Sequence, residues 1–329
     1  FKGWKVTSDT TGTGWPNATY TTSPLAAGKY GDVELTAQWE IVTYSISYEL
    51  NAGTANNPTS YTVVTPSFTL VNPTKTGYTF TGWTGTDLEE ASMEVTIAQG
   101  STGNRSYTAT WEANTYYVEF IGNNATSGSM NKQTFTYDAD PTALTANDYE
   151  RTGYEFAGWS TSVNGAKVYN DGEEVKNLTA EPNETVTLYA VWSAVEYTIT
   201  YDLDGTLESG AANPQTYTIE DSFTLAKATK EGYNFAGWTV SATVGSWAEG
   251  TEFKNEGTGL SIAAGQYGNV TLTAQWTTIE YTISYNLNGG ALETGVKNPT
   301  TYNIESEDIT LNNPTREGYT FVGWTGTDL

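Results

Sequence analysis

The chain has 329 residues with no cysteine and no histidine, and 14 basic against 38 acidic residues give it a formal net charge of −24. Without cysteine or histidine it cannot form a Ser-His-Asp triad, a Cys-His nucleophile or a Cys/His zinc site, so we expect no enzyme and no cofactor. The negative charge disfavours nucleic acid and anionic membrane surfaces, while 13% aromatic residues predict a folded protein.

Residues 1–40 read as the second half of a repeated unit. They begin with Phe1-Lys2-Gly3-Trp4 and end with a run, Val33 to Trp39, in which apolar and polar residues alternate. Alternation with period two predicts a strand. The same kind of closing strand, ending on Trp, recurs at Ser106 to Trp111, Thr185 to Trp192 and Gly268 to Trp276.

Each complete unit is expected to open on an alternating strand such as Tyr44 to Leu50, followed by Asn, Gly and Pro turns. The motif GYxFxGW then follows at Gly77 to Trp83. Its Tyr and Phe should face one side of a sheet, its second Gly should mark a bulge, and its Trp should enter the core. Further copies lie at Gly153 to Trp159, Gly232 to Trp238 and Gly318 to Trp324.

One basic residue stands two positions before the first Gly of every complete motif. These residues are Lys75, Arg151, Lys230 and Arg316. We expect each to cap the turn or to pair with a neighbouring acid, either of which contributes little on an exposed turn.

The connector between units has a constant length. The closing Trp and the next opening Tyr are always five positions apart, as in Trp39 and Tyr44. Connectors with β-branched residues and without Gly or Pro predict extended chain and a fixed rotation between units, hence an elongated rod. The predicted domains are an N-terminal half-repeat (1–40), repeat I (41–113), repeat II (114–194), repeat III (195–278) and a C-terminal half-repeat (279–329).

The combination of YxIxYxLNGG, NPTxxGYxFxGW and TLTAQW resembles the Listeria-Bacteroides repeat, also seen as the internalin B-repeat, over essentially the whole chain. Repeat II departs from it, because Ile121 to Asn124 replace the LNGG turn and Asp148 to Glu150 replace the NPT turn. The resemblance implies small, mainly β, β-grasp-like domains in tandem on bacterial cell-surface or secreted proteins, with roles as stalk, spacer or adhesive segment. It brings no catalytic residues.

Two tryptophans, Trp15 and Trp247, fall in the variable loops after the GW motif. An exposed loop Trp could contact a glycan or protein ligand, whereas a Trp folded back over its own domain would be structural. Acidic pairs such as Asp202 and Asp204 lack the spacing of a known calcium loop, so we read them as solvated acids and expect no metal site.

The two half-repeats carry complementary parts of one unit, which suggests that copies of the chain could join head to tail into a filament. The expected function is therefore a stalk, spacer or fibre segment outside the cell, and the alternative is an adhesin module that uses the variable loops. Expected partners are neighbouring repeats, other copies of the chain, and a host or environmental glycan or protein. No membrane insertion is expected in this segment.

Overall fold

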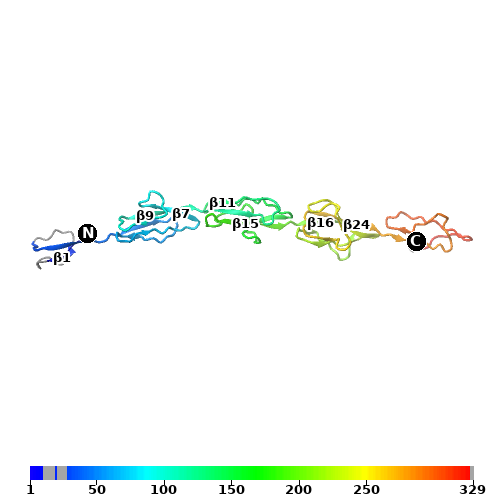
Figure 1. The fold of residues 1–329 in the computed structure, drawn as a ribbon. Helices are drawn as coiled ribbons and strands as arrows, with labels where there is room; N and C mark the ends of the chain where they lie inside the picture. The colour runs from blue at the N-terminus through cyan, green and yellow to red at the C-terminus, as the bar shows by residue number, and fades with distance from the viewer. Residues whose placement is uncertain (10–18, 21–27, 327–329) are drawn as a thin grey trace. The chain divides into compact units, whose positions relative to one another are not determined.

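The computed structural model describes residues 1–9, 19–20 and 28–326, and this part of the chain is built from strands and loops without a helix (Figure 1). The sequence prediction of a mainly β chain made of tandem β domains is confirmed. The described residues contain no helix that is long and apolar enough to span a membrane.

Repeat I is organised around one mixed sheet. Strand β4 (Tyr44–Glu49) runs parallel to β9 (Arg105–Ala113), and β7 (Tyr78–Gly85) runs antiparallel to the other edge of β9. The short strand β5 (Ser60–Tyr61) completes the order β5-β4-β9-β7. The closing strand therefore lies at the centre of the sheet, between the opening strand and the GYxFxGW strand.

Repeats II and III have the same order of four strands, and repeat III has β22 as a fifth. In repeat II the sheet is β11 (Gln133–Thr136), β10 (Thr115–Ile121), β15 (Thr185–Ala194) and β13 (Tyr154–Ser160). In repeat III it is β18 (Thr216–Tyr217), β16 (Tyr197–Asp202), β24 (Val270–Thr278), β21 (Tyr233–Val240) and β22 (Glu252–Lys254).

Short two-stranded sheets accompany these three sheets. They pair β6 (Phe68–Thr69) with β8 (Thr96–Ile97), β12 (Thr142–Ala143) with β14 (Glu174–Val175), β17 (Thr206–Leu207) with β20 (Ala228–Thr229), and β19 (Phe223–Thr224) with β23 (Ser261–Ile262).

The described residues of the two half-repeats form fewer strands. The N-terminal half has the order β2 (Thr19–Tyr20), β1 (Gly3–Asp9) and β3 (Val33–Gln38). The C-terminal half has one described pair, β25 (Tyr281–Thr282) with β26 (Thr301–Tyr302).

The motif places its Trp in the core, and the Gly before this Trp marks a bulge, as predicted. The register of β7 against β9 shifts between Phe80 and Gly82, and Gly82 has φ 137°. This bulge changes the alternation, so that Trp83 points inward and is 0% exposed. Its indole N–H donates to the Asn72 side chain at 3.1 Å, which satisfies the one polar atom that the ring buries.

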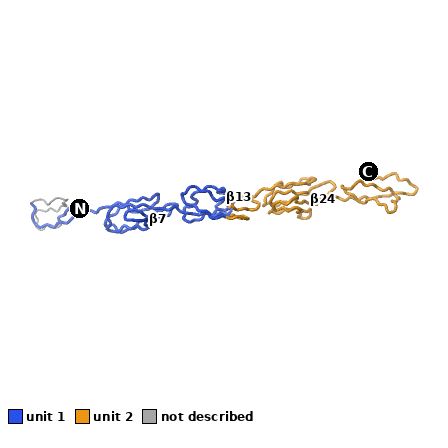
Figure 2. The backbone as a smooth tube through the Cα atoms, turned by 90° about the horizontal axis from the view of Figure 1, so that it is seen from above, with its two compact units in different colours: residues 1–121, 130–147, 159–189 blue, residues 122–129, 148–158, 190–329 orange. Residues whose placement is uncertain are grey.

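Contacts within the chain define two compact units (Figure 2). One comprises residues 1–121, 130–147 and 159–189, and the other comprises residues 122–129, 148–158 and 190–329. The repeat boundaries, the elongated rod and the β-grasp-like detail of the fold stay predictions.

Candidate functional site

Successive repeats touch through the first two residues of the GYxFxGW motif. At the end of repeat I, a Cβ added to Gly77 would enter the ring of Tyr137 in repeat II. The Tyr78 ring meets the same Tyr137 ring edge-on, with 6.0 Å between centroids, and its hydroxyl donates to the Asp138 carboxylate at 3.1 Å. We call this contact a joint.

The same joint recurs twice more along the chain. In each case a Gly packs on an apolar side chain of the following repeat and the adjacent Tyr donates a hydrogen bond to the acid beside that side chain. In the second joint, Gly153 packs on Ile219 and the Tyr154 hydroxyl donates to Glu220 at 2.8 Å. In the third joint, Gly232 packs on Ile304 and the Tyr233 hydroxyl donates to Glu305 at 2.8 Å.

The connector explains why the Trp-to-Tyr spacing is constant. In repeats I, II and III, the third residue after the closing Trp donates its backbone N–H to the carbonyl of the joint glycine. The pairs are Asn114 to Gly77 at 2.9 Å, Val195 to Gly153 at 3.0 Å and Ile279 to Gly232 at 2.9 Å. An insertion or deletion in the connector would displace this donor, so its length is constrained by the joint.

Asn114 adds side-chain bonds to the first joint. It is 6% exposed, accepts a hydrogen bond from the Thr79 hydroxyl at 2.7 Å and donates to the carbonyl of Ala180 at 2.7 Å. It therefore links the motif strand of repeat I to a loop of repeat II. A buried amide with these partners stabilises one arrangement of the two repeats.

The basic residue before each motif lies over the tyrosine ring. The distances from the charged group to the ring centroid are 3.7 Å for Lys75 and Tyr78, 3.7 Å for Arg151 and Tyr154, 4.2 Å for Lys230 and Tyr233, and 3.9 Å for Arg316 and Tyr319. The predicted pairing with an acid is found for Lys230, which bonds Asp204 at 2.8 Å. The cation–π contact is the common feature, and it was not predicted from the sequence.

The hydrogen bonds of the joints change the acidity of their partners. The bond to Asp138 raises the pKa of Tyr78, and the bond to Glu305 raises that of Tyr233 in the same way. The pKa of the Asp138 carboxyl is lowered, first by the amide of Asn177 and then by the Tyr78 hydroxyl and the charge of Lys176. In the first joint the raised pKa of Tyr78 and the lowered pKa of Asp138 favour a neutral tyrosine beside an ionised acid.

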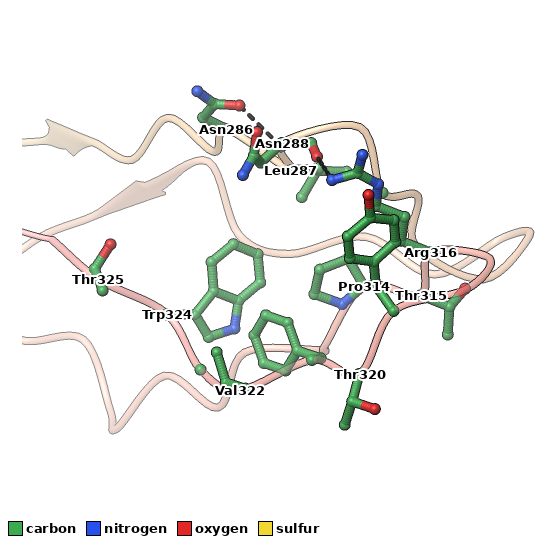
Figure 3. Close-up of a pocket in the computed structure, with 14 residues that line it drawn as sticks. Asn286, Leu287, Asn288, Pro314, Thr315, Arg316, Thr320, Val322, Trp324 and Thr325 are labelled. Atoms are coloured by element: carbon green, nitrogen blue, oxygen red, sulfur yellow. Dashed lines mark hydrogen bonds between the residues drawn. The ribbon is translucent and has the colours of Figure 1, made fainter.

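The C-terminal half-repeat shows the motif with its inner face open (Figure 3). A hollow of about 280 Å³ lies beneath the loop that contains Asn288, with Trp324 and Val322 along it. Arg316 donates to the carbonyl of Asn288 at 3.0 Å. Tyr319 is 67% exposed and Val322 is 97% exposed.

The two residues predicted to contact a ligand have different outcomes. Trp15 lies outside the described residues. Trp247 is 3% exposed in the core of repeat III, where its indole N–H donates to the Tyr217 hydroxyl at 2.7 Å and its ring packs on Phe253. Of the two interpretations of Trp247, the structure agrees with a ring folded back over its own domain, where a ring this large gains more than on the loop surface. Ligand binding by these loops stays a prediction.

The described residues contain no group of three or more Asp, Glu, His or Cys side chains placed to hold a metal ion. Of the acidic pair singled out in the sequence, Asp204 forms the ion pair with Lys230. The absence of catalysis, cofactors and metals stays a prediction.

Sequence reasoning missed the acceptor side of the joint. The signal is an apolar residue followed by an acid directly after the second strand of a repeat, as in Ile219-Glu220 and Ile304-Glu305. Repeat I has Val63-Val64 at this position, with exposed fractions of 37% and 58%. A comparison of the repeats with one another would have revealed the pattern, although its pairing with the Gly-Tyr of another repeat required the structure.

Comparison with known proteins supports the repeat organisation. The model of the Listeria-Bacteroides repeat domain matches residues 44–110, 116–191, 197–275 and 281–328. Two proteins of Evansella cellulosilytica, both named as membrane proteins and one as Gly-rich, are 26% identical over 296 and 298 residues. These matches cover 89% and 88% of this chain, and 31% and 40% of the relatives.

Internalin H of Listeria monocytogenes is 31% identical over 140 residues, which cover 42% of this chain and 21% of the internalin. The chain spans less than half the length of each of these relatives.

Proposed function

This chain belongs to the Listeria-Bacteroides repeat family, and from this we propose that it is the repeat region of a bacterial surface protein, where it acts as a stalk or spacer. The observation that carries the proposal is the joint. One set of contacts recurs at Gly77, Gly153 and Gly232, and each couples one repeat to the next. A spacer needs this property, because repeats that contact their neighbours resist bending more than repeats on free linkers.

An extracellular location, on the cell surface or secreted, is part of this proposal. It is supported by the membrane and internalin names of the relatives. The net charge of −24 agrees with it, since a strongly charged surface keeps an exposed repeat region soluble.

Single-molecule stretching tests the stalk. The chain is held by its two ends and extended. Complete repeats should unfold one at a time in a sawtooth, each releasing on the order of 250 Å of contour length. A smooth extension without unfolding events would contradict a load-bearing role.

Head-to-tail assembly of copies of the chain is a second candidate. In repeats I and III the indole N–H of the closing Trp donates to the carbonyl of the residue directly after the opening strand, as Trp111 does to Leu50 at 3.1 Å and Trp276 to Leu203 at 3.2 Å. In the N-terminal half the corresponding Trp39 is 75% exposed. The C-terminal half carries the corresponding acceptor residue, Leu287, beside its open hollow.

A closing strand from the N-terminal half of a second copy would therefore fit the C-terminal half of the first. Sedimentation over a dilution series tests this, with Trp39→Ala as the variant. Concentration-dependent assembly that the variant weakens is expected. A monomer at every concentration would contradict assembly and leave the stalk proposal intact.

An adhesin module remains the alternative function. The burial of Trp247 argues against its ring as a ligand contact in the folded repeat. Trp15 keeps its place as a candidate ligand contact of the variable loops.

A further inference from the structure

Repeat II contains a hollow of about 410 Å³ beside the second joint, whose Tyr154 forms part of its wall. Four aromatic side chains line it, those of Tyr149, Tyr154, Phe156 and Trp192. Phe156 and Trp192 meet edge-on at 5.6 Å, and the Trp192 indole N–H is already bonded to the Gly122 carbonyl at 2.9 Å. The aromatic wall is therefore held in place by the fold.

The hollow is formed where repeat II departs from its sister repeats. Tyr149 occupies the position of Pro73 in repeat I and Ala228 in repeat III, and it lies within the segment that replaces the NPT turn. On its other side, the loop of residues 122–128 forms an adjoining hollow of about 350 Å³ that Tyr149 also lines. A Cβ on Gly122 would lie 2.8 Å from the Tyr149 ring, so this ring packs closely on the loop.

Polar groups stand beside the aromatic wall. The Arg151 guanidinium lies 3.7 Å from the Tyr154 ring centroid, and a guanidinium has five N–H donors. Of its counterparts, Lys230 bonds Asp204 and Arg316 bonds the Asn288 carbonyl. Arg151 therefore keeps donors for a ligand.

The Glu150 carboxylate accepts from the Ser127 hydroxyl at 3.0 Å and retains further lone pairs. Repeats I and III and the C-terminal half have Thr at this position, as Thr74, Thr229 and Thr315. The hollow thus combines a fixed aromatic wall with one donor group, Arg151, and one acceptor group, Glu150, where repeats I and III have Lys and Thr.

Aromatic rings next to a guanidinium and a carboxylate, in an open hollow of this size, suit a pyranose ring, which has apolar C–H faces and a rim of hydroxyls that both donate and accept. The net charge of −24 disfavours an anionic sugar. We propose that repeat II binds a neutral oligosaccharide in this hollow, with a sugar ring against Tyr149 and Trp192 and its hydroxyls bonded to Arg151 and Glu150. This proposal assigns a binding site in repeat II to the alternative adhesin function, and it does not depend on the proposed stalk function.

Saturation-transfer NMR on the whole chain tests the proposal. The probes are the neutral trisaccharides N-acetylchitotriose, cellotriose and mannotriose, with trigalacturonic acid as the anionic comparator. At least one neutral trisaccharide should receive saturation. Its affinity should fall about tenfold in Tyr149→Ala, which installs the residue that repeat III carries at this position.

Arg151→Lys serves as a second variant, because Lys occupies this position in repeats I and III and the fold tolerates it there. It should weaken binding through loss of the planar donor pair. Tyr319→Ala, which removes an exposed tyrosine beside an arginine outside the hollow, should leave binding unchanged. The proposal is overturned if no neutral trisaccharide binds at millimolar concentration, if Tyr149→Ala folds and binds as before, or if the anionic trisaccharide binds best.

Discussion

Gly232 and Ile304 belong to successive repeats, and a Cβ at position 232 would lie 2.5 Å from the Ile304 Cδ1 atom. The same close approach separates Gly153 from Ile219, at 2.6 Å. Glycine is required here twice over, because its φ is +78° at both positions and because the next repeat leaves no room for a side chain. The joint is thus built into the motif that also supplies the core.

Alanine at Gly232 should weaken the joint between repeat III and the C-terminal half. The matched control is Gly318→Ala, which has the same φ of +78° and no neighbouring atom within 4 Å. Backbone strain of about 1–2 kcal/mol applies to both, while the clash adds about 1–3 kcal/mol at Gly232 alone. Thermal unfolding of both variants measures the difference, and equal losses of stability would mean that the joint contributes nothing.

Trp247 should behave as a core residue. Trp247→Ala is expected to destabilise repeat III by about 3–5 kcal/mol, because it leaves a large cavity and removes the bond to Tyr217. Trp247→Phe should cost less, since it keeps most of the apolar area. Chemical denaturation followed by circular dichroism checks both values. Wild-type stability in the alanine variant would restore the exposed-loop interpretation.

The buried tryptophan of the motif should matter far more than the exposed closing one of the N-terminal half. Trp238 is 0% exposed and Trp39 is 75% exposed. Trp238→Ala should cost about 3–5 kcal/mol of unfolding free energy, and Trp39→Ala at most about 0.5 kcal/mol. Proteolysis of the two variants under native conditions offers an independent measure, in which cleavage within repeat III should increase only for the first.

The joint between repeats I and II should weaken in acid. The pKa of Asp138 is lower in the folded chain than in the unfolded one, so the carboxylate stabilises the joint fully above the ordinary Asp pKa. This contribution is lost as the pH falls through the folded value, below a pH of about 4. Melting temperatures of wild type and Asp138→Asn should therefore differ at neutral pH and converge in acid. A difference that persists at the lowest pH would contradict the assignment.

Much of the fold followed from local patterns in the sequence. Strict alternation located the opening and closing strands, and the second Gly of the motif marked the bulge that turns Trp83 inward. The joint could not be predicted in the same way. Gly77 and Tyr137 are 60 residues apart in the sequence, and so are Tyr78 and Asp138. No local periodicity relates residues of different repeats.

The surroundings of the candidate ligand residues could not be predicted from local sequence patterns either. Trp247 lies in a loop by sequence, but Tyr217 and Phe253 surround it only after the sheet of repeat III has formed. The hollow of repeat II was visible in the sequence only as a departure at residues 121–124 and 148–150. That departure indicated a different turn and gave no sign that Tyr149 would lie beside Trp192.

Coupling between repeats is the central claim, and a distance distribution across one joint tests it most directly. The chain has no cysteine, so Met93→Cys and Asp140→Cys place two spin labels on exposed positions of repeats I and II without competing thiols. Double electron–electron resonance should give one narrow distribution, which Gly77→Ala broadens. A broad distribution in the unaltered joint, unchanged by Gly77→Ala, would mean that the repeats move independently and would contradict the account.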